Sequence, residues 1–547
     1  MKAIHAYIFE AKKLDISFLR WKINSGGEEQ MESTDKLKMD STVLQYVPKG
    51  AFYEGQDEQF EAILQIWQQL FKYDRVMFGL LTLLGGTGFS KGAMNHMLLA
   101  NPQTGTGKDL VPEALPEEFE SNIVRYNLDK LSETKFARAL KNLMMLTGGE
   151  GFVKVNNART RKIILEFVFS RENKHLDSLA VNFKTKLRKL VRHALGKQTV
   201  HKILQGDEQL FDKWVGRYNK WAYPVVLHLF DKRPALKTKT VTGHFPMISK
   251  YWYLKKAAQD GSVERFTKYM KGMPQRTVIG FRNTFKIPIE LSEIYNQSKS
   301  SDQDKLQLEA ARKKSGAKAV TINYKKYDIY DLWKSFYFKL LSGDPENMKE
   351  VLEAISYRIE KTEKLNFGGK TAVIIDASRS MMGSDKRAMH PFLTALSVLS
   401  TLDVEMNETI FVGGKLVETP IGGPPAIVPM NHTDLWRGLV KAVQSGADNI
   451  VVISDGYENA VKGMFEHTYN YFKESGYNFK LIHFNPVFSA ESKSGTARRL
   501  AKDVKPLPLA DYKFIETELI FNQMIENREM VKKLLVNKYQ KLLGGGK

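Results

Sequence analysis

The chain has 547 residues, a mass of 62.5 kDa and a formal net charge of +21, with 43% apolar and 26% charged residues. This composition is typical of a globular chain and excludes disordered and fibrous classes, and the length predicts about three or four domain-sized units. The absence of cysteine excludes a disulfide scaffold, a thiolate zinc site and a thiol nucleophile.

The N-terminal segment 1–55 is an extension of unknown role that resembles nothing we can name. Its first fifteen residues carry charges where a signal peptide needs an apolar core. No apolar run in the chain approaches the roughly 18 residues of a membrane span. We therefore expect a soluble, cytoplasmic protein with no membrane partner.

Residues 56–365 show the apolar spacing of amphipathic helices, punctuated at short intervals by Gly, Pro, Asn and Asp. The predicted helical segments are 57–84, 117–131, 134–146, 159–170, 183–196, 207–230, 262–273, 327–341 and 345–361. About eight helical hairpins of ~40 residues would fit this length, which predicts a HEAT-like solenoid although no internal repeat is visible. Segment 296–319, rich in small and polar residues, is expected to be an exposed loop.

The positive charge is concentrated in one part of this helical region. Residues 151–300 contain 30 Lys and Arg against 11 Asp and Glu, whereas residues 366–547 contain 22 against 19. Such a local excess favours a polyanionic partner, because each neutralised phosphate releases condensed counterions. The alternative is an ordinary basic, solvated surface.

After residue 366 the pattern changes to that of an α/β domain. Four short runs rich in Val, Ile and Phe alternate with helical stretches, which predicts a doubly wound, Rossmann-like parallel sheet. The predicted strands are 370–378, 408–414, 449–456 and 479–486, and the predicted helices are 390–402, 434–443 and 464–475. In such sheets ligands bind beyond the carboxyl ends of the strands.

The loops at these strand ends carry oxygen-bearing side chains. Asp376, Ser378 and Ser380 follow the first strand, Thr433 lies in a second loop, and Asp455 follows a later strand. Hard cations such as Mg²⁺ prefer oxygen ligands, so this set predicts a divalent-metal site. The alternative is that both serines only cap the following helix.

This order of residues resembles the metal-ion-dependent adhesion site of von Willebrand factor A domains, D-x-S-x-S followed by distant Thr and Asp. Arg379 departs from that pattern, because a small residue is common at its position and a nearby cation weakens metal binding. An A domain behind a basic, HEAT-like region resembles the Ro ribonucleoprotein family, whose N-terminal part is the TROVE domain. Segment 268–286, with Met273, Pro274, Arg282 and Asn283, is similar to a signature of that family.

The resemblance covers residues 55–545 in architecture and implies a TROVE domain over 56–365 and an A-like domain with a C-terminal helix over 366–547. It also implies a helical ring closed by the A domain. Family members bind small non-coding Y RNAs and the single-stranded 3′ ends of misfolded RNAs, and they are not nucleases. An exoribonuclease or another protein is a further expected partner, bound through the A domain.

Helix 184–197 is the strongest candidate for RNA contact in the sequence itself. Its cations populate the faces beside an apolar stripe, and no acidic residue occurs between 178 and 206. We therefore expect these cations to repel one another unless a polyanion neutralises them. The candidate residues here are Lys184, Arg188, Lys189, Arg192, His193 and Lys197. The alternative is an amphipathic helix with a solvated basic face.

Segment 265–286 interleaves cations with aromatic residues, a mixture that suits single-stranded RNA. Within it Arg276 and Arg282 are the candidates, whereas Tyr269 and Phe281 are expected to pack in the interior. No nucleophile–base pair is visible in the sequence, so we expect no catalysis.

Two other functions remain open at this stage. One is a protein–protein adaptor in which the A-domain metal coordinates a partner's carboxylate, and the other is a structural or assembly protein, for example of a bacteriophage. The C-terminal segment 516–543 is expected to cap the end of the solenoid, because it carries an apolar stripe of Leu519, Ile520, Met524, Met530, Leu534 and Leu535.

Overall fold

The computed structural model describes residues 56–100, 115–116, 118–148, 152–300, 315–317, 322–384, 387–404, 408–422, 425–458, 460–486, 498–509, 511–519 and 528–543. The predicted N-terminal extension and most of the predicted loop 296–319 lie outside this range. Within it, no helix combines the length and the apolar character that crossing a membrane requires.

The chain forms two compact units. We call the first the helical unit; its described residues lie within Lys91–Ile322 and from Tyr539 onward. We call the second the sheet-bearing unit; its described residues lie in 56–90 and within Asn323–Lys538. The predicted combination of a mostly helical protein with a C-terminal parallel sheet is confirmed.

The helical unit is built from short helices whose ends follow local sequence signals. Asn157 and Ser262 cap their helices by accepting the backbone N–H of Thr160 and Arg265, and Gly196 ends a helix at a φ of 81°. The helices are α4 (Gly88–Ala100, which begins in the other unit), α5 (Phe119–Leu146), α6 (Ala158–Phe169), α7 (Asn173–Asn182), α8 (Lys184–Leu195), α9 (Lys197–Leu204), α10 (Glu208–Phe211), the π-helix η4 (Asp212–Gly216), α11 (Tyr223–Leu229), α12 (Lys239–His244), α13 (Pro246–Gln259), α14 (Val263–Met270), α15 (Gln275–Phe285) and α16 (Leu291–Gln297).

The sheet-bearing unit contains five parallel strands in the order β4-β1-β7-β8-β9. They are β1 (Thr371–Asp376), β4 (Thr409–Val412), β7 (Asn449–Ile453), β8 (Lys480–Asn485) and β9 (Pro506–Pro508). The chain passes from β1 outward to β4 and then returns to the other side of β1 as β7. The strand order therefore reverses at β1, which is where ligands bind in open α/β sheets.

Two antiparallel strand pairs accompany this sheet, neither of which we predicted: β2 (Gly383–Ser384) with β3 (Arg387–Ala388), and β5 (Gly414–Val417) with β6 (Ala426–Pro429). The helices of the unit are α2 (Gln56–Tyr73), α3 (Arg75–Leu81), the 3₁₀-helix η5 (Tyr324–Lys326), α18 (Ile329–Ser342), α19 (Met348–Lys361), η6 (Arg379–Met382), α20 (His390–Leu399), α21 (Leu435–Gln444), α22 (Met464–Glu474), η8 (Tyr512–Phe514) and α24 (Arg528–Leu543).

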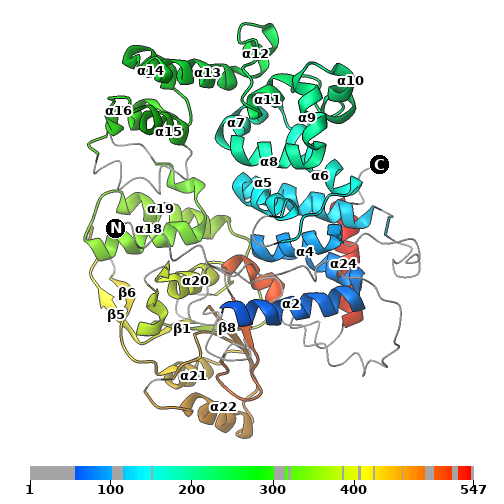
Figure 1. Ribbon diagram of the computed structural model, residues 1–547. Helices are drawn as coiled ribbons and strands as arrows, with labels where there is room; N and C mark the ends of the chain where they lie inside the picture. The colour runs from blue at the N-terminus through cyan, green and yellow to red at the C-terminus, as the bar shows by residue number, and fades with distance from the viewer. Residues whose placement is uncertain are drawn as a thin grey trace. The chain divides into compact units, whose positions relative to one another are not determined.

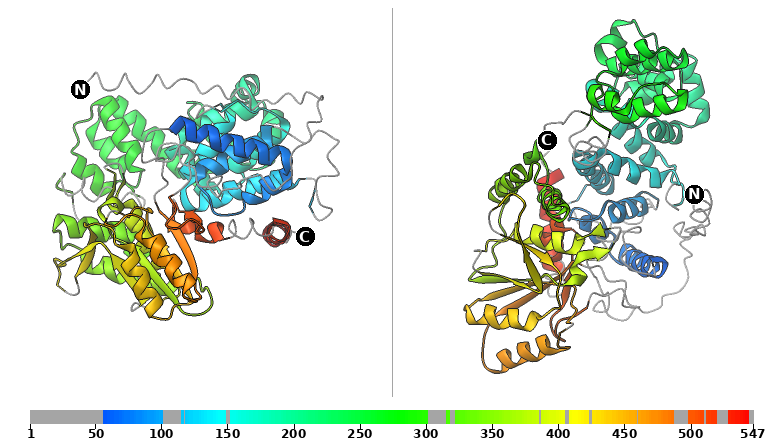
Figure 2. Two further views of the ribbon diagram at one scale, coloured as in Figure 1. Left: turned by 90° about the horizontal axis from the view of Figure 1, so that it is seen from below. Right: turned by 90° about the vertical axis from the view of Figure 1, so that its left-hand side faces the viewer.

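Helices cover both faces of the sheet, so its central strands are buried throughout (Figures 1 and 2). Ala372 and Ile374 of β1 pack into one cluster with Leu435 and Leu439 of α21. The alternate β1 residues face the other side, where α20 contacts the strand. This two-sided burial explains why the strands read as continuous apolar runs in the sequence.

The sheet-bearing unit begins before residue 366, where we expected the α/β domain to start. Helix α18 packs on α20 through the rings of Tyr337 and Phe392, whose centroids are 5.5 Å apart. Tyr330 Oη lies 2.6 Å from His390 Nδ1, and Trp333 donates its indole N–H to Ser400 Oγ at 3.2 Å. These contacts place 323–361 with the sheet.

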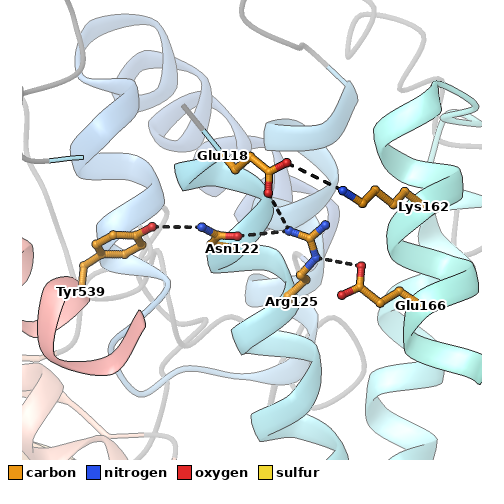
Figure 3. Close-up of polar contacts among 6 residues, drawn as sticks. All are labelled: Glu118, Asn122, Arg125, Lys162, Glu166 and Tyr539. Carbon is orange, nitrogen blue, oxygen red and sulfur yellow. Dashed lines mark hydrogen bonds and ion pairs between the residues drawn. The ribbon is translucent and has the colours of Figure 1, made fainter. Parts of the chain in front are cut away.

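The buried face of α24 includes Leu535 of the predicted stripe but not Met530 or Leu534. Val531, Leu535 and Tyr539 are buried at helical spacing, whereas Met530 and Leu534 of the predicted stripe are about half exposed. In the helical unit, Tyr539 packs on the ring of Phe119 and accepts a hydrogen bond from Asn122 Nδ2 at 3.4 Å (Figure 3). The end of the chain thus contributes to the interior of that unit.

Candidate functional site

The first predicted metal ligand, Asp376, is fixed between two neighbouring strand ends. It is the last residue of β1 and is fully buried. Its Oδ1 accepts the backbone N–H of Ser378 at 2.8 Å, and its Oδ2 accepts the hydroxyl of Ser454 at 2.7 Å. Since Ser454 follows β7, the strand adjacent to β1, the sheet itself sets the position of this carboxylate.

The serine loop after β1 is tied to the loop that follows β6. Ser378 Oγ lies 2.9 Å from Ser380 Oγ, and Ser378 forms a parallel bridge with Asn431. Arg379 donates its backbone N–H to Asn431 O at 3.1 Å, while its side chain is exposed. Solvent therefore screens the Arg379 charge, which reduces the effect of this departure from the expected pattern.

Thr433 lies two residues beyond Asn431, so the same bridge brings it near the serine loop. It is 1% exposed, and its Oγ1 has no hydrogen-bond partner among the described residues. A buried hydroxyl without a partner costs about 1–3 kcal/mol. An electropositive ligand at this position would supply the missing interaction.

Asp455 follows Ser454 at the end of β7 and is 3% exposed. Its Oδ1 accepts the backbone N–H of Tyr457 at 3.0 Å. Burial and the nearby Asp455 charge raise the pKa of Asp376 to about 7, although Ser378 and Ser454 donate hydrogen bonds to it. Two buried carboxylates repel each other when both are ionised, and a bound cation relieves that repulsion.

The five predicted ligands therefore come from three loops at one end of the sheet, and together they offer two carboxylates and three hydroxyls. The part of the chain that the structure describes contains no group of three or more His, Cys, Asp and Glu side chains suited to a metal. An oxygen set of this kind fits a hard cation such as Mg²⁺, which keeps several waters, and the unpartnered Thr433 hydroxyl is consistent with it.

Two residues of this site were missed in the sequence. Ser454 orients Asp376, and its position directly before Asp455 at a strand end was the available signal. Gly413, at the end of β4, has a φ of 84°, and a Cβ there would lie 2.8 Å from His432 O and 3.2 Å from Ser378 Cα. Only glycine lets the two loops approach this closely.

In the helical unit, the basic candidates on α8 and α9 divide by exposure. Lys189, Arg192 and Lys197 are exposed, and Lys189 and Lys197 form no ion pair within the described residues. Arg192 lies over the ring of Phe230, 5.5 Å from its centroid. These three side chains remain the surface candidates.

Lys184 and Arg188 are neutralised inside the protein, contrary to our expectation. Asp231, which follows α11, places one carboxylate oxygen 2.5 Å from Lys184 Nζ and pairs its other oxygen with Arg188. The sequence window 178–206 lacks acidic residues, but the fold brings a carboxylate from outside it. The inference that these two cations need an external polyanion was wrong for that reason.

His193 belongs to the interior of the unit. It is 9% exposed, and its Nε2 lies 2.6 Å from Val155 O. Burial lowers the pKa of His193, and the bond to Val155 opposes that effect. His193 therefore does not lie on the surface where RNA would contact α8.

The candidates of α15 also divide. Arg282 is half-buried, and its Nε donates to Ile289 O at 2.6 Å, whereas Arg276 is exposed. The rings of Tyr269 and Phe281 pack on Tyr253 and Tyr251, with centroids 5.1 Å apart in both pairs, but both residues are partly exposed and do not lie in the interior as we expected. Arg276 is therefore the candidate for surface contact, and Arg282 holds the end of its own helix.

A series of cation–aromatic pairs was missed. Lys213, Arg217 and Lys220 each lie over the aromatic ring of the next residue, at 4.6–5.8 Å from the centroid. Trp221, the last of these rings, is 40% exposed and stacks on His244. Alternating cations and aromatic residues in 213–221 were the available signal. Such pairs suit unpaired bases, which need π-faces beside phosphate-binding charge.

A cavity of about 370 Å³ lies among α5, α6 and α7, and Figure 3 shows Arg125 and Glu166 of its lining. Arg125 on its wall donates to Glu166 at 3.1 Å, and Arg171 approaches Asp129 at 3.5 Å. Burial raises the pKa of Asp129, and the Arg171 charge opposes this rise. Asp129, Glu166 and Glu172 outnumber the two guanidinium groups in its lining, so the cavity lacks the net positive charge that a polyanion needs.

The chain matches no known protein family and no curated protein at the sequence level. The functional argument therefore rests on the fold and these side chains: exposed cations in the helical unit, and oxygen-bearing side chains at the strand ends of the α/β unit.

Proposed function

We propose that this chain is a non-catalytic RNA-binding protein of the Ro type, whose helical unit takes small non-coding RNAs or the single-stranded 3′ ends of misfolded RNAs. The observation that carries the proposal is the excess of 30 cations over 11 carboxylates in residues 151–300. Exposed side chains such as Lys189, Arg192 and Lys197 supply that charge without carboxylate partners in the described residues. Phosphate neutralisation by such a surface is favourable and independent of sequence.

The test is the binding of a fluorescein-labelled 20-nucleotide single-stranded RNA to the full chain, measured by anisotropy at increasing salt. Log K should fall linearly with log salt, at about −0.7 per phosphate contacted, so five or six contacts give a slope near −4. The variant Lys189→Gln/Arg192→Gln/Lys197→Gln should bind more weakly and flatten the slope by roughly two.

The matched control carries the same loss of charge in the sheet-bearing unit, as Lys415→Gln/Lys441→Gln/Lys480→Gln at three exposed lysines. It should bind RNA within about twofold of the wild type if the helical unit carries the interface. Equal losses in both variants, or a wild type that does not bind RNA, would overturn the proposal.

Two finer features belong to the same proposal. The helices would form HEAT-like repeats in a ring, and the α/β part would be a von Willebrand A domain that holds Mg²⁺ through Asp376, Ser378, Ser380, Thr433 and Asp455. Packed helix pairs such as α13 with α14 and α18 with α19 support the first feature. Small-angle scattering tests it, because a closed ring gives a compact profile and an open solenoid an elongated one.

A second candidate function is a metal-dependent protein adaptor. The unpartnered Thr433 hydroxyl beside two buried carboxylates favours it, because a cation held there would keep a position for a carboxylate from a partner such as an exoribonuclease. Asp376→Ala separates the two candidates. It should leave RNA affinity unchanged if the helical unit alone binds RNA, and it should abolish any Mg²⁺-dependent protein capture.

A further inference from the structure

Asp231 holds two cations of the basic surface together. Its Oδ1 accepts Lys184 Nζ at 2.5 Å, and its Oδ2 accepts Arg188 Nη1. Burial alone would raise the pKa of Asp231, but the charges of Lys184, Arg188 and Lys255 lower it below its ordinary value. Two cations bind this carboxylate and the charge of a third, Lys255, acts on it, so the group keeps a net positive charge.

Lys184 and Lys255 are held in place by contacts other than Asp231. Lys184 Nζ lies 4.9 Å from the ring centroid of Tyr251 and 5.4 Å from that of Trp252, and Lys255 Nζ lies 4.8 Å from the Trp252 ring. Lys184 also donates to Tyr251 Oη at 3.5 Å, and only 12% of its side chain is exposed. These two lysines are preorganised, so an incoming anion does not have to order their side chains.

The Asp231 side chain can move away from Lys184 and Arg188 without any change in the backbone. The residue lies in the left-handed region at a φ of 61°, and its N–H is held by His228 O at 3.2 Å. Its side chain is 48% exposed, so it can rotate into solvent. The next two residues, Lys232 and Arg233, are exposed cations that form no ion pair in the described part of the chain.

A carboxylate that binds two cations through its two oxygens has the geometry of a phosphodiester binding through its two non-bridging oxygens. We propose that Lys184, Arg188 and Lys255 form a phosphate-binding cradle for the RNA backbone, which Asp231 occupies in the free protein. The inference rests on the proposed RNA-binding function and adds a competition to it. A phosphate of the RNA displaces Asp231, so the pairing of Asp231 with these cations lowers the affinity for every RNA that uses the cradle.

The test is the affinity of the full chain for the same labelled single-stranded RNA, in wild type, Asp231→Asn and Asp231→Gly. Asn and Gly both tolerate a positive φ, so each variant removes the carboxylate without straining the backbone. The matched control is Asp260→Asn, which also removes one carboxylate from the helical unit, in this case the partner of Lys256 at 2.8 Å. Circular dichroism and thermal melting establish whether each variant is folded. If Asp231→Asn is not folded, the affinity of Asp231→Gly is the test.

Both Asp231 variants should bind RNA about fivefold more tightly than the wild type, and the control less than about twofold, as expected for the loss of a partly buried competing ion pair. In an Arg188→Gln background the increase in RNA affinity should disappear, because the cradle then lacks the Arg188 guanidinium. If the wild type binds RNA but Asp231→Asn and Asp231→Gly gain no more than Asp260→Asn, the cradle is refuted and the proposed function stands. A wild type that does not bind RNA refutes both.

Discussion

The helical unit and the sheet-bearing unit place their candidate functional groups in opposite environments. Lys189, Arg192 and Lys197 are exposed on α8 and α9, whereas Asp376 and Asp455 are at most 3% exposed at the ends of β1 and β7. Exposed cations attract a ligand at a distance and lose that attraction in salt. Buried carboxylates act only at contact and are controlled by protonation. The comparison teaches that salt and pH should separate the proposed RNA binding from the proposed metal binding.

The largest expected effect comes from Asp376→Ala, which should abolish Mg²⁺ binding because it removes one of only two carboxylates at the site. Isothermal titration calorimetry with Mg²⁺ measures this loss. Asp503→Ala, at an exposed carboxylate of the same unit, is the control and should bind Mg²⁺ as the wild type does. If Asp376→Ala also weakened RNA binding at constant salt, the assignment of RNA binding to the helical unit alone would be wrong.

The pH dependence sharpens the same comparison. Since the pKa of Asp376 is raised to about 7, protons compete with Mg²⁺, and the metal affinity should fall about tenfold for each pH unit below 7. RNA affinity through Lys and Arg should stay flat between pH 6 and pH 8. Without metal, the raised pKa of Asp376 makes the free energy of unfolding decrease as pH rises from about 4 to about 7.

Titration calorimetry at several pH values and urea unfolding of the metal-free protein measure these two trends. The Asp376→Asn variant should lose the decrease in stability between pH 4 and pH 7. A wild-type metal affinity that stays constant from pH 6 to pH 8 would contradict the assignment.

Gly413→Ala tests how tightly the strand-end loops are packed. Its added Cβ would lie 2.8 Å from His432 O, and the residue has a φ of 84°. Gly446→Ala is the control, because its φ is 74° and nothing lies within 4 Å of the added Cβ. Backbone strain should destabilise both variants by about 1 kcal/mol. The close contacts of the added Cβ should lower the free energy of unfolding of Gly413→Ala by roughly a further 1–3 kcal/mol relative to the control. Thermal melting compares them, and equal melting temperatures would mean that the loops can separate.

The smallest expected effect concerns the interior of the helical unit. Tyr539→Phe removes the hydroxyl that accepts from Asn122 and should reduce the free energy of unfolding by about 0.5–1.5 kcal/mol. Tyr471→Phe, at a tyrosine that is 61% exposed, should have no measurable effect. Urea unfolding curves provide the comparison. No loss for Tyr539→Phe would show that only the ring contact with Phe119 matters.

The sheet and the polar residues that follow its strands were predictable because both depend on local sequence patterns. Continuous apolar runs marked β1, β4, β7 and β8, and parallel strands bring residues such as Asp376 and Asp455 to the same end. The short β9, with two prolines, has no such run and was missed. The relation between Ser378 and Thr433 depends on the Asn431 bridge and on Gly413, which no periodicity reveals.

The basic surface was less predictable, because burial and ion pairing there depend on contacts between distant residues. Asp231 reaches Arg188 across 43 positions of sequence, so a window without acidic residues did not mean unpaired cations. His193 borders the apolar stripe of α8, and its burial is decided by Val155, 38 positions away. Composition located the excess of cations along the sequence, whereas the exposure and the partner of each cation required the fold.

The prolines of β9 have a consequence for how the sheet ends. Leu509 donates its N–H inward to Asn485 O at 2.8 Å, so by the alternation along a strand the nitrogens of Pro506 and Pro508 face outward. Proline nitrogens carry no hydrogen, and the outer side of β9 therefore lacks the donors that another strand would need. The sheet is closed to growth at this side, which protects the protein against fibre formation through strand addition between copies.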